Sequence, residues 1–294
     1  MGSRRAAKHA RRRAAGRPRH TARVWATAAG AAGVVALAAL GVHSAIIHTD
    51  PPSIHARPAP SPQLMPFPDL AARARLQRVP LYPAHEPAIV PRKSWGADES
   101  LRTEPPHYST TVKAVFLHHT DSGNDYKCAD VPRIIRDIYS GHIQSRHWDD
   151  VAYNFFVDKC GTIYEGRAGG SDRPVTGAHS IGFNKDTMGI AAIGTYDAKG
   201  SVPQAMAEAI ARIAAWKLGL SDVDPRGEVT LVSSSSKSRF KKGERAVFHV
   251  IAGHRDAYMT DCPGKELYAE LPEIRTEAAR LQGRPPLRTA KSKG

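Results

Sequence analysis

Two histidine-bearing segments and one cysteine have the residue types and spacing of a metal site. The apolar segment VKAVFLHHT ends in the pair His118 and His119, and the apolar segment AVFHVIA is followed closely by His254. Cys262 comes eight residues after His254, in a segment that reads as a loop. Two imidazoles and a thiolate, with a water molecule in the fourth position, form the ligand set of a catalytic zinc site.

Only one histidine of the pair can face such a site. Successive side chains of a strand point to opposite faces of the sheet. His118 is therefore expected on the same face as Val112 and Phe116. His119 is expected on the other face, with Leu117.

The three cysteines divide into a pair and a single residue. In an oxidising compartment Cys128 and Cys160 can form a disulfide. Closing a loop of that length stabilises a fold by about 3–4 kcal/mol in the chain-entropy model. Cys262 is then left over, and metal ligation accounts for it.

The elements that must position these residues alternate between strands and helices. Strands are predicted at residues 112–120, 152–157, 162–165, 188–196 and 246–252. Helices are predicted from Asp130, over residues 203–218 with Ser201 as a candidate cap, and over residues 264–281 with an interruption or kink at Pro272. This order predicts an α/β domain with a mixed central sheet.

The N-terminal region has the composition of an export signal or an anchor. Residues 1–23 carry nine Lys and Arg residues and no acidic residue, whereas residues 24–47 carry no charged residue at all. As a helix the second segment would be about 36 Å long, which is enough to cross a bilayer. We expect a signal peptide or a transmembrane anchor, and whether it is cleaved stays open. The formal charge of +14 comes mainly from the basic tail, so it does not indicate a nucleic-acid partner.

The rest of the chain divides by its proline content. Residues 48–91 hold eleven of the 22 prolines, which predicts a semi-extended linker. The folded domain is predicted at residues 92–282. Residues 283–294 are predicted to form a disordered basic tail.

Several motifs along the predicted domain resemble those of the peptidoglycan recognition proteins and type 2 N-acetylmuramoyl-L-alanine amidases. The similarity runs from Arg92 to about Arg275. Its motifs are RKSWGA (92–97), FLHHT (116–120), WDDVAYNF (148–155), DKCGTIYEGR (158–167), GAH (177–179), GHRD (253–256) and TDCPG (260–264).

The resemblance implies a fold, a cofactor and a reaction. The fold is a mixed sheet flanked by helices, and Zn²⁺ is held by His118, His254 and Cys262. The reaction is hydrolysis of the amide between N-acetylmuramic acid and L-alanine in peptidoglycan. With the N-terminal segment, it places a monomeric enzyme outside the cytoplasm, secreted or membrane-anchored and facing the cell wall.

The resemblance also assigns roles around the metal. Tyr153 and Thr260 are the catalytic positions that stabilise negative charge on the carbonyl oxygen, and Tyr153 also orients the water; some phage relatives carry lysine in place of Thr260. The identity of the general base stays open. The substrate-binding positions are His142, Arg146, Trp148, His179 and Asn184. The helical i+4 spacing independently places His142 and Arg146 on one face.

Two other functions remain compatible with these residues. A non-catalytic peptidoglycan-binding module is the main alternative, although such relatives typically lack the zinc cysteine. A structural zinc domain would need a fourth protein ligand, for which Asp261 or His249 are the candidates. Trp148 matches relatives that prefer diaminopimelate in the stem peptide, but His147 matches neither the diaminopimelate nor the lysine type.

Overall fold

The computed structural model describes residues 79–197 and 201–286. The predicted basic tail, the apolar segment at 24–47, most of the linker and residues 287–294 lie outside the described residues. Within the described part of the chain, no helix has both the length and the apolar character needed to span a bilayer.

A mixed sheet forms the centre of the domain. Its strands are β1 (Ile89–Val90), β2 (Ala114–His119), β3 (Phe155–Val157), β4 (Ile163–Glu165), β5 (Thr187–Ala192) and β8 (Ile251–Gly253), in the spatial order β1-β4-β3-β5-β2-β8. β3 and β4 are antiparallel, and the other neighbours are parallel. The predicted α/β fold with a mixed central sheet is therefore confirmed.

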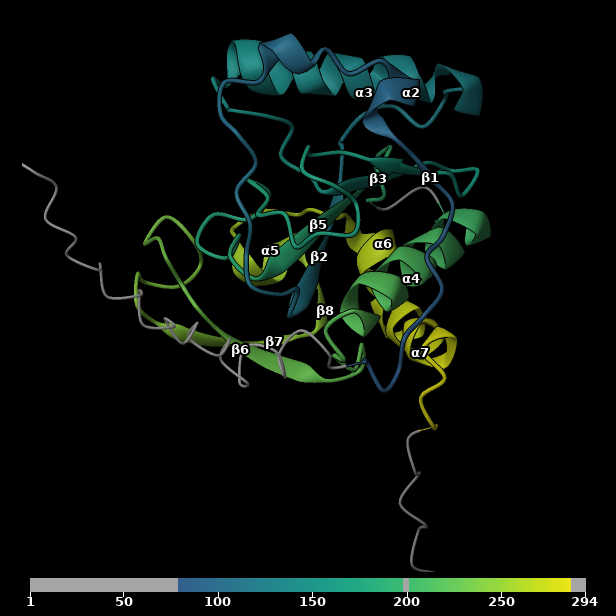
Figure 1. Ribbon diagram of the computed structural model, residues 1–294, viewed down its shortest axis with the longest axis vertical. Helices are drawn as coiled ribbons and strands as arrows, with labels where there is room; N and C mark the ends of the chain where they lie inside the picture. Colours follow the sequence, from purple (N-terminus) through teal and green to yellow (C-terminus); the bar gives the residue numbers. More distant parts are fainter. Residues whose placement is uncertain (1–78, 198–200, 287–294) are drawn as a thin grey trace, which may run out of the picture. The chain divides into compact units, whose positions relative to one another are not determined.

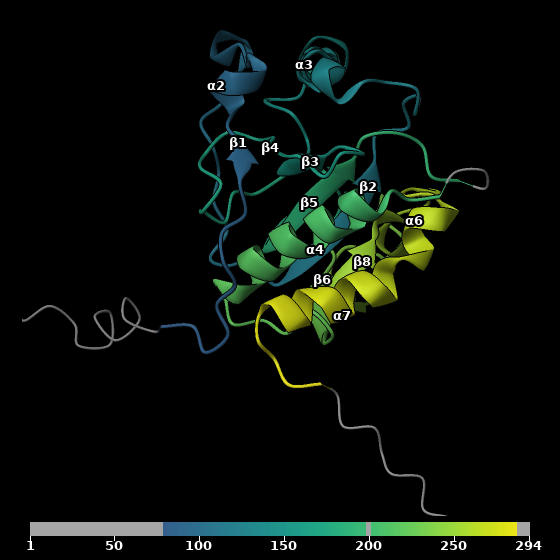
Figure 2. The ribbon, with the colours of Figure 1, turned by 90° about the vertical axis from the view of Figure 1, so that its right-hand side faces the viewer.

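Two helices cover one face of the sheet, as Figure 1 and Figure 2 show. They are α4 (Gln204–Gly219) and α7 (Leu271–Leu281), and α6 (Lys265–Ala269) precedes α7. Apolar side chains of β2 and β5, including Val115, Leu117 and Ile190, pack against them and are fully buried. The alanines of α4 leave little side-chain bulk, so the helix can lie close to the strands.

A pair of helices and a separate hairpin cover the opposite face. The helices α2 (Arg92–Trp95) and α3 (Val131–Ser140) pack over β3 and β4 through a cluster that contains Trp95 and Phe156. A hairpin of β6 (Glu228–Val232) and β7 (Arg245–His249) packs over β2 and β8 through Phe116 and Phe248. Short elements complete the chain: 3₁₀ turns at Glu99–Leu101 and Cys128–Asp130, a π-helical turn at Gly141–Ser145, and α5 (His254–Ala257).

The predicted strand at 246–252 is wrong, because it is two strands. β7 pairs with β6 in the hairpin, whereas β8 pairs with β2 in the central sheet. The chain changes sheets at Val250, whose amide donates to the carbonyl of Gly227. The hairpin partner β6 was not predicted.

Three smaller predictions also differ from the structure. Val112 packs with the α4 side of the sheet instead of with Phe116, because regular strand alternation begins only at Ala114. Pro203, not Ser201, is the N-cap of α4. The sheet already includes Ile89, ahead of the boundary predicted at residue 92.

The C-terminal helical region is interrupted, as its proline predicts. α6 ends at Ala269, and α7 begins anew with Pro272 in its first turn, where the missing N–H has no intrahelical partner to lose.

A disulfide ties the α3 side of the domain to the sheet. Cys128, in the turn before α3, is bonded to Cys160, in the turn between β3 and β4. Cys262 is the free cysteine among the described residues. The pairing predicted from the sequence is confirmed.

Replacing both bonded cysteines by serine is expected to lower the free energy of unfolding by about 3–4 kcal/mol, since the unfolded chain regains the entropy of an open loop. Urea denaturation of the oxidised proteins measures this difference. The wild-type protein in reductant serves as the control and is expected to match the double variant. Equal midpoints for oxidised wild type and variant would show that the bond does not stabilise the fold.

Candidate metal centre

His118, His254 and Cys262 lie together at one edge of the sheet. Their ligand atoms are all within 4.8 Å of one another. The rings of His118 and His254 have centroids 4.4 Å apart, and the Sγ of Cys262 is 3.8 Å from Nδ1 of His118. The arrangement brings the three residues selected from the sequence to one point.

Parallel pairing accounts for the two histidines. β2 and β8 run side by side with Leu117 opposite Gly253. The residue after Leu117 and the residue after Gly253 are both histidines, so His118 and His254 lie at the same edge of the sheet. His254 is also the first residue of α5, and the carboxylate of Asp256 accepts from the amide of Gly253 at 2.9 Å. Asp256 was not predicted, although its place three residues after Gly253 is typical of a helix start.

Backbone hydrogen bonds hold the cysteine beside the histidines. The amide of Arg255 donates to the carbonyl of Cys262 at 2.9 Å, and the amide of His119 donates to its Sγ at 3.3 Å. The amide of Cys262 donates to the hydroxyl of Thr260 at 3.2 Å. The hydroxyl of Thr260 therefore already helps to shape the loop that carries the sulfur.

The chemistry of the three donors fits zinc. Burial lowers the pKa of His118 well below its usual range and lowers that of His254 to about 4, so both rings are neutral and can offer a lone pair. Burial raises the pKa of the Cys262 thiol to about 12, so a thiolate at neutral pH needs a cation beside it. Neutral imidazoles and a thiolate suit zinc, whereas magnesium and calcium prefer oxygen donors.

The candidates for a fourth protein ligand lie elsewhere. The side chain of Asp261 is almost fully exposed beside Arg255, and His249 is exposed on β7. Neither belongs to the donor cluster in the described part of the chain. The other close group of potential donors contains the Cys128–Cys160 disulfide, whose sulfurs are not available as thiolates.

A row of rings runs from the donor cluster toward α3. Tyr153 lies 5.1 Å from His118 and 5.8 Å from His142, measured between ring centroids, and His142 lies 4.8 Å from Trp148. The guanidinium of Arg146 is 5.3 Å from the centre of the Trp148 ring. The structure thus places four of the predicted catalytic and substrate-binding residues in one continuous row beside His118.

Tyr153 is held as a hydrogen-bond donor. Burial, and after it the neighbouring Cys262, raises the pKa of the tyrosine far above its usual value, so the hydroxyl keeps its proton. None of the hydrogen bonds among residues 79–197 and 201–286 uses this hydroxyl, which leaves it available to another molecule.

His179 and Asn184 hold different positions from the row. His179 is buried, and its Nδ1 lies 3.1 Å from Nε2 of His118. The amide oxygen of Asn184 accepts from the backbone of Ser180 at 2.8 Å, which fixes the turn after His179. Contact of either residue with a substrate stays a prediction.

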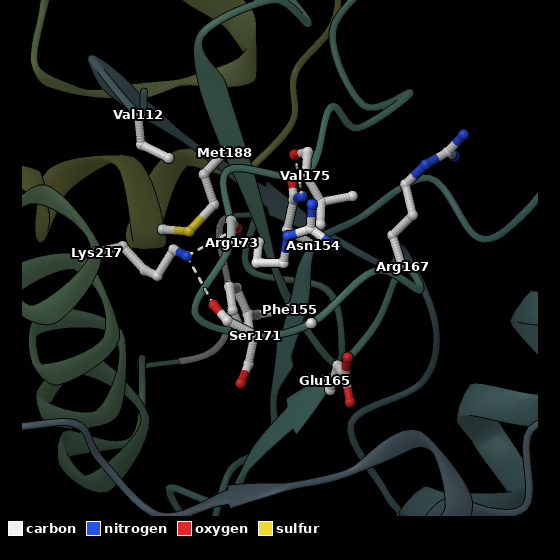
Figure 3. Close-up of a pocket in the computed structure, with 11 residues that line it drawn as sticks. Val112, Asn154, Phe155, Glu165, Arg167, Ser171, Arg173, Val175, Met188 and Lys217 are labelled. Atoms are coloured by element: carbon white, nitrogen blue, oxygen red, sulfur yellow. Dashed lines mark hydrogen bonds between the residues drawn. The ribbon is translucent and has the colours of Figure 1, made fainter. Parts of the chain in front are cut away.

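A small cavity lies at the other end of the strands. Figure 3 shows Val112, Met188 and Lys217 around it, and the ammonium of Lys217 donates to the carbonyls of Ser171 at 2.6 Å and Arg173 at 3.0 Å. The space holds about one water molecule. Lys217 therefore fastens the 170–175 loop to α4, and the cavity is too small to admit a substrate.

Comparison with known proteins identifies a family model that covers the candidate site. Residues 108–265, which contain every site residue discussed above, match the family model described as N-acetylmuramoyl-L-alanine amidase. Peptidoglycan-recognition protein LE of Drosophila melanogaster is 42% identical over 109 residues, which are 37% of this chain and 30% of the relative. The N-acetylmuramoyl-L-alanine amidase of Homo sapiens is 29% identical over 185 residues, which are 62% of this chain and 27% of the relative. The chain thus spans less than a third of the length of either relative.

A solved structure shares the fold. The crystal structure of Drosophila peptidoglycan recognition protein SD matches with a TM-score of 0.50 at 20% identity, over 64% of this chain and 95% of that chain.

His142 makes the stability of the metal-free protein depend on pH. Its Nδ1 accepts from the amide of Ala152 at 3.2 Å, and burial, then Arg146, lowers its pKa to about 4. As the pH falls from about 6.5 to 4, the unfolded chain takes up a proton that the folded chain does not bind, so folding loses stability. His142→Asn keeps an acceptor for Ala152 but cannot be protonated. The variant is therefore expected to lose about 2–3 kcal/mol less stability than wild type over this range.

Urea denaturation at pH 7 and pH 4, after removal of metal with a chelator, measures the effect. His85→Asn, which changes an exposed histidine, is the matched control and is expected to behave as wild type. An unchanged pH dependence in His142→Asn would show that His142 titrates equally in both states.

Proposed function

Because the chain belongs to the N-acetylmuramoyl-L-alanine amidase family, we propose that it is a zinc-dependent enzyme that hydrolyses the amide between N-acetylmuramic acid and L-alanine in peptidoglycan. The observation that carries the proposal is the cluster of His118, His254 and Cys262, with ligand atoms within 4.8 Å. Three protein ligands leave one position for water or substrate, as in catalytic zinc sites.

The protein residues have distinct tasks in this proposal. When bound, zinc would lower the pKa of a water molecule and polarise the amide carbonyl. Tyr153, which keeps its proton, donates a hydrogen bond to the carbonyl oxygen as negative charge develops there. Thr260 supports the same charge through its hydroxyl proton, since the oxygen of that hydroxyl is occupied by the amide of Cys262.

The row from Tyr153 to Arg146 is the proposed substrate-binding surface. Relatives are named for peptidoglycan recognition, which supports a muropeptide ligand. The rings of His142 and Trp148 offer an apolar wall to the sugar, and the exposed Arg146 offers a positive charge to the acidic stem peptide.

We also propose that the enzyme works outside the cytoplasm as a monomer. The Cys128–Cys160 disulfide is typical of proteins in an oxidising compartment. The charge-free segment at 24–47 would export the chain, and would attach it to the membrane if it is not cleaved.

Cys262→Ser tests whether the chain hydrolyses peptidoglycan or only binds it. Serine cannot replace a thiolate as a zinc ligand near neutral pH. The full-length variant is expected to lose bound zinc and to release no peptides that begin with L-alanine. It should still sediment with insoluble peptidoglycan, because the row from Tyr153 to Arg146 does not include the sulfur. Elemental analysis and mass spectrometry of the digest measure both properties.

His85→Ala is the matched control for metal bound adventitiously by surface histidines, and it is expected to retain about one zinc per chain. Wild-type rates of peptide release by Cys262→Ser would refute the zinc mechanism. A wild-type protein that binds zinc and peptidoglycan but releases no peptide would instead be a recognition module.

Tyr153→Phe tests the proposed hydrogen bond. The change keeps the ring beside His118 and removes the hydroxyl, so zinc content should stay near wild type. Turnover is expected to fall by roughly 10²–10³-fold, the usual effect of losing one such donor. Tyr82→Phe, a change in the segment before β1, is the control with normal turnover. A rate within a few-fold of wild type for Tyr153→Phe would remove the tyrosine from the mechanism.

A further inference from the structure

A chain of buried hydrogen bonds leads from the candidate metal centre into the sheet. Nε2 of His118 lies 3.1 Å from Nδ1 of His179. Nε2 of His179 lies 3.4 Å from the hydroxyl of Thr187, which in turn donates to the carbonyl of Phe183 at 2.5 Å. His118, His179 and Thr187 are each at most 5% exposed.

The carbonyl at the end of this chain fixes every proton along it. A carbonyl oxygen can only accept, so the Thr187 hydroxyl gives its proton to Phe183. The Thr187 oxygen then accepts from Nε2–H of His179, which leaves Nδ1 of that neutral ring without a proton. Nδ1 of His179 must accept from Nε2–H of His118.

The consequence falls on the other nitrogen of His118. A neutral imidazole carries one proton, so Nδ1 of His118 has a free lone pair. This is the nitrogen that lies 3.8 Å from Sγ of Cys262. The protonation pattern that Phe183 dictates is therefore the one that a metal at the donor cluster requires.

The ring of His179 is also fixed in position. A Cβ at Gly189 would lie 2.4 Å from Cγ of His179, and one at Gly177 would lie 2.5 Å from its Cδ2. Two glycine backbones thus press on the ring and leave it no room to turn. The same confinement leaves almost none of its surface for a substrate.

We propose that His179 and Thr187 are positioning residues that fix the tautomer and orientation of His118 for metal binding. This role differs from the substrate contact that the sequence predicted for His179, and it rests on the proposed zinc function. Outer partners of this kind typically change metal affinity by about 10–100-fold.

Thr187→Val removes the hydroxyl at nearly constant volume, and Thr187→Ser is the matched variant that keeps it. The proposal expects full-length Thr187→Val to bind zinc about 10–100-fold more weakly than wild type, measured by competition with a chromophoric chelator. Thr187→Ser is expected to bind within a few-fold of wild type. If Thr187 had a purely structural role, Thr187→Val would lower the melting temperature of the metal-free protein, but Thr187→Val and Thr187→Ser would bind zinc with similar affinity.

The tautomer gives a readout that needs neither metal nor activity. ¹⁵N NMR of the metal-free, wild-type protein should show His118 protonated at Nε2 and unprotonated at Nδ1, and Thr187→Val should show a mixture of tautomers. A proton on Nδ1 of His118 in wild type would overturn the proposal even if the variants fail to fold. If wild type binds zinc and Thr187→Val binds it equally well, only this proposal fails. If wild type binds no zinc, the proposed function fails and this proposal fails with it.

Discussion

The parallel pairing of β2 with β8 is the constraint on which the candidate site depends. Because Leu117 lies opposite Gly253, the residues that follow them, His118 and His254, lie at the same edge of the sheet. A slip of one residue would turn His118 to the opposite face, because strand side chains alternate. Cys262 is held at the same edge, because its carbonyl accepts a hydrogen bond from the amide of Arg255, the residue after His254.

The two faces of the sheet are packed by different clusters of side chains. The α4 side is a continuous apolar core that keeps β2 and β5 in place. The other face is shared between the cluster under α2 and α3, which contains Trp95 and Phe156, and the cluster under the hairpin, which contains Phe116 and Phe248. Tyr153 packs on Phe156 of the first of these clusters at 5.5 Å, while its other neighbour is His118. A structural side chain thereby sets the position of a reactive one.

Local sequence patterns predicted the features that depend on neighbouring residues or on the number of cysteines. Strand alternation separated His118, which lies in the donor cluster, from His119, which does not. Cysteine parity together with export selected the Cys128–Cys160 pair. The patterns could not show where the chain changes sheets at Val250, because one apolar run is compatible with one strand or with two.

Contacts between distant segments were beyond those patterns as well. The hydrogen bond between His118 and His179 joins residues 61 positions apart, and no local pattern in either segment predicts it. Gly189 was the available signal, because a glycine inside a strand often marks the close approach of another group. The widened π-helical turn at Gly141–Ser145, which carries His142, likewise depends on what packs around it.

The burial of Cys262 has a consequence for the redox behaviour of the whole chain. Disulfide exchange proceeds through a thiolate. In the metal-free protein Cys262 is only 8% exposed, and burial raises the pKa of its thiol to about 12, so it supplies almost no thiolate. In the folded, metal-free protein the thiol of Cys262 is therefore shielded from oxidants. It is also unable to attack the Cys128–Cys160 bond. Only the unfolded chain, with three equivalent cysteines, can mispair. Correct folding thus separates the cysteines into one disulfide and one buried thiol.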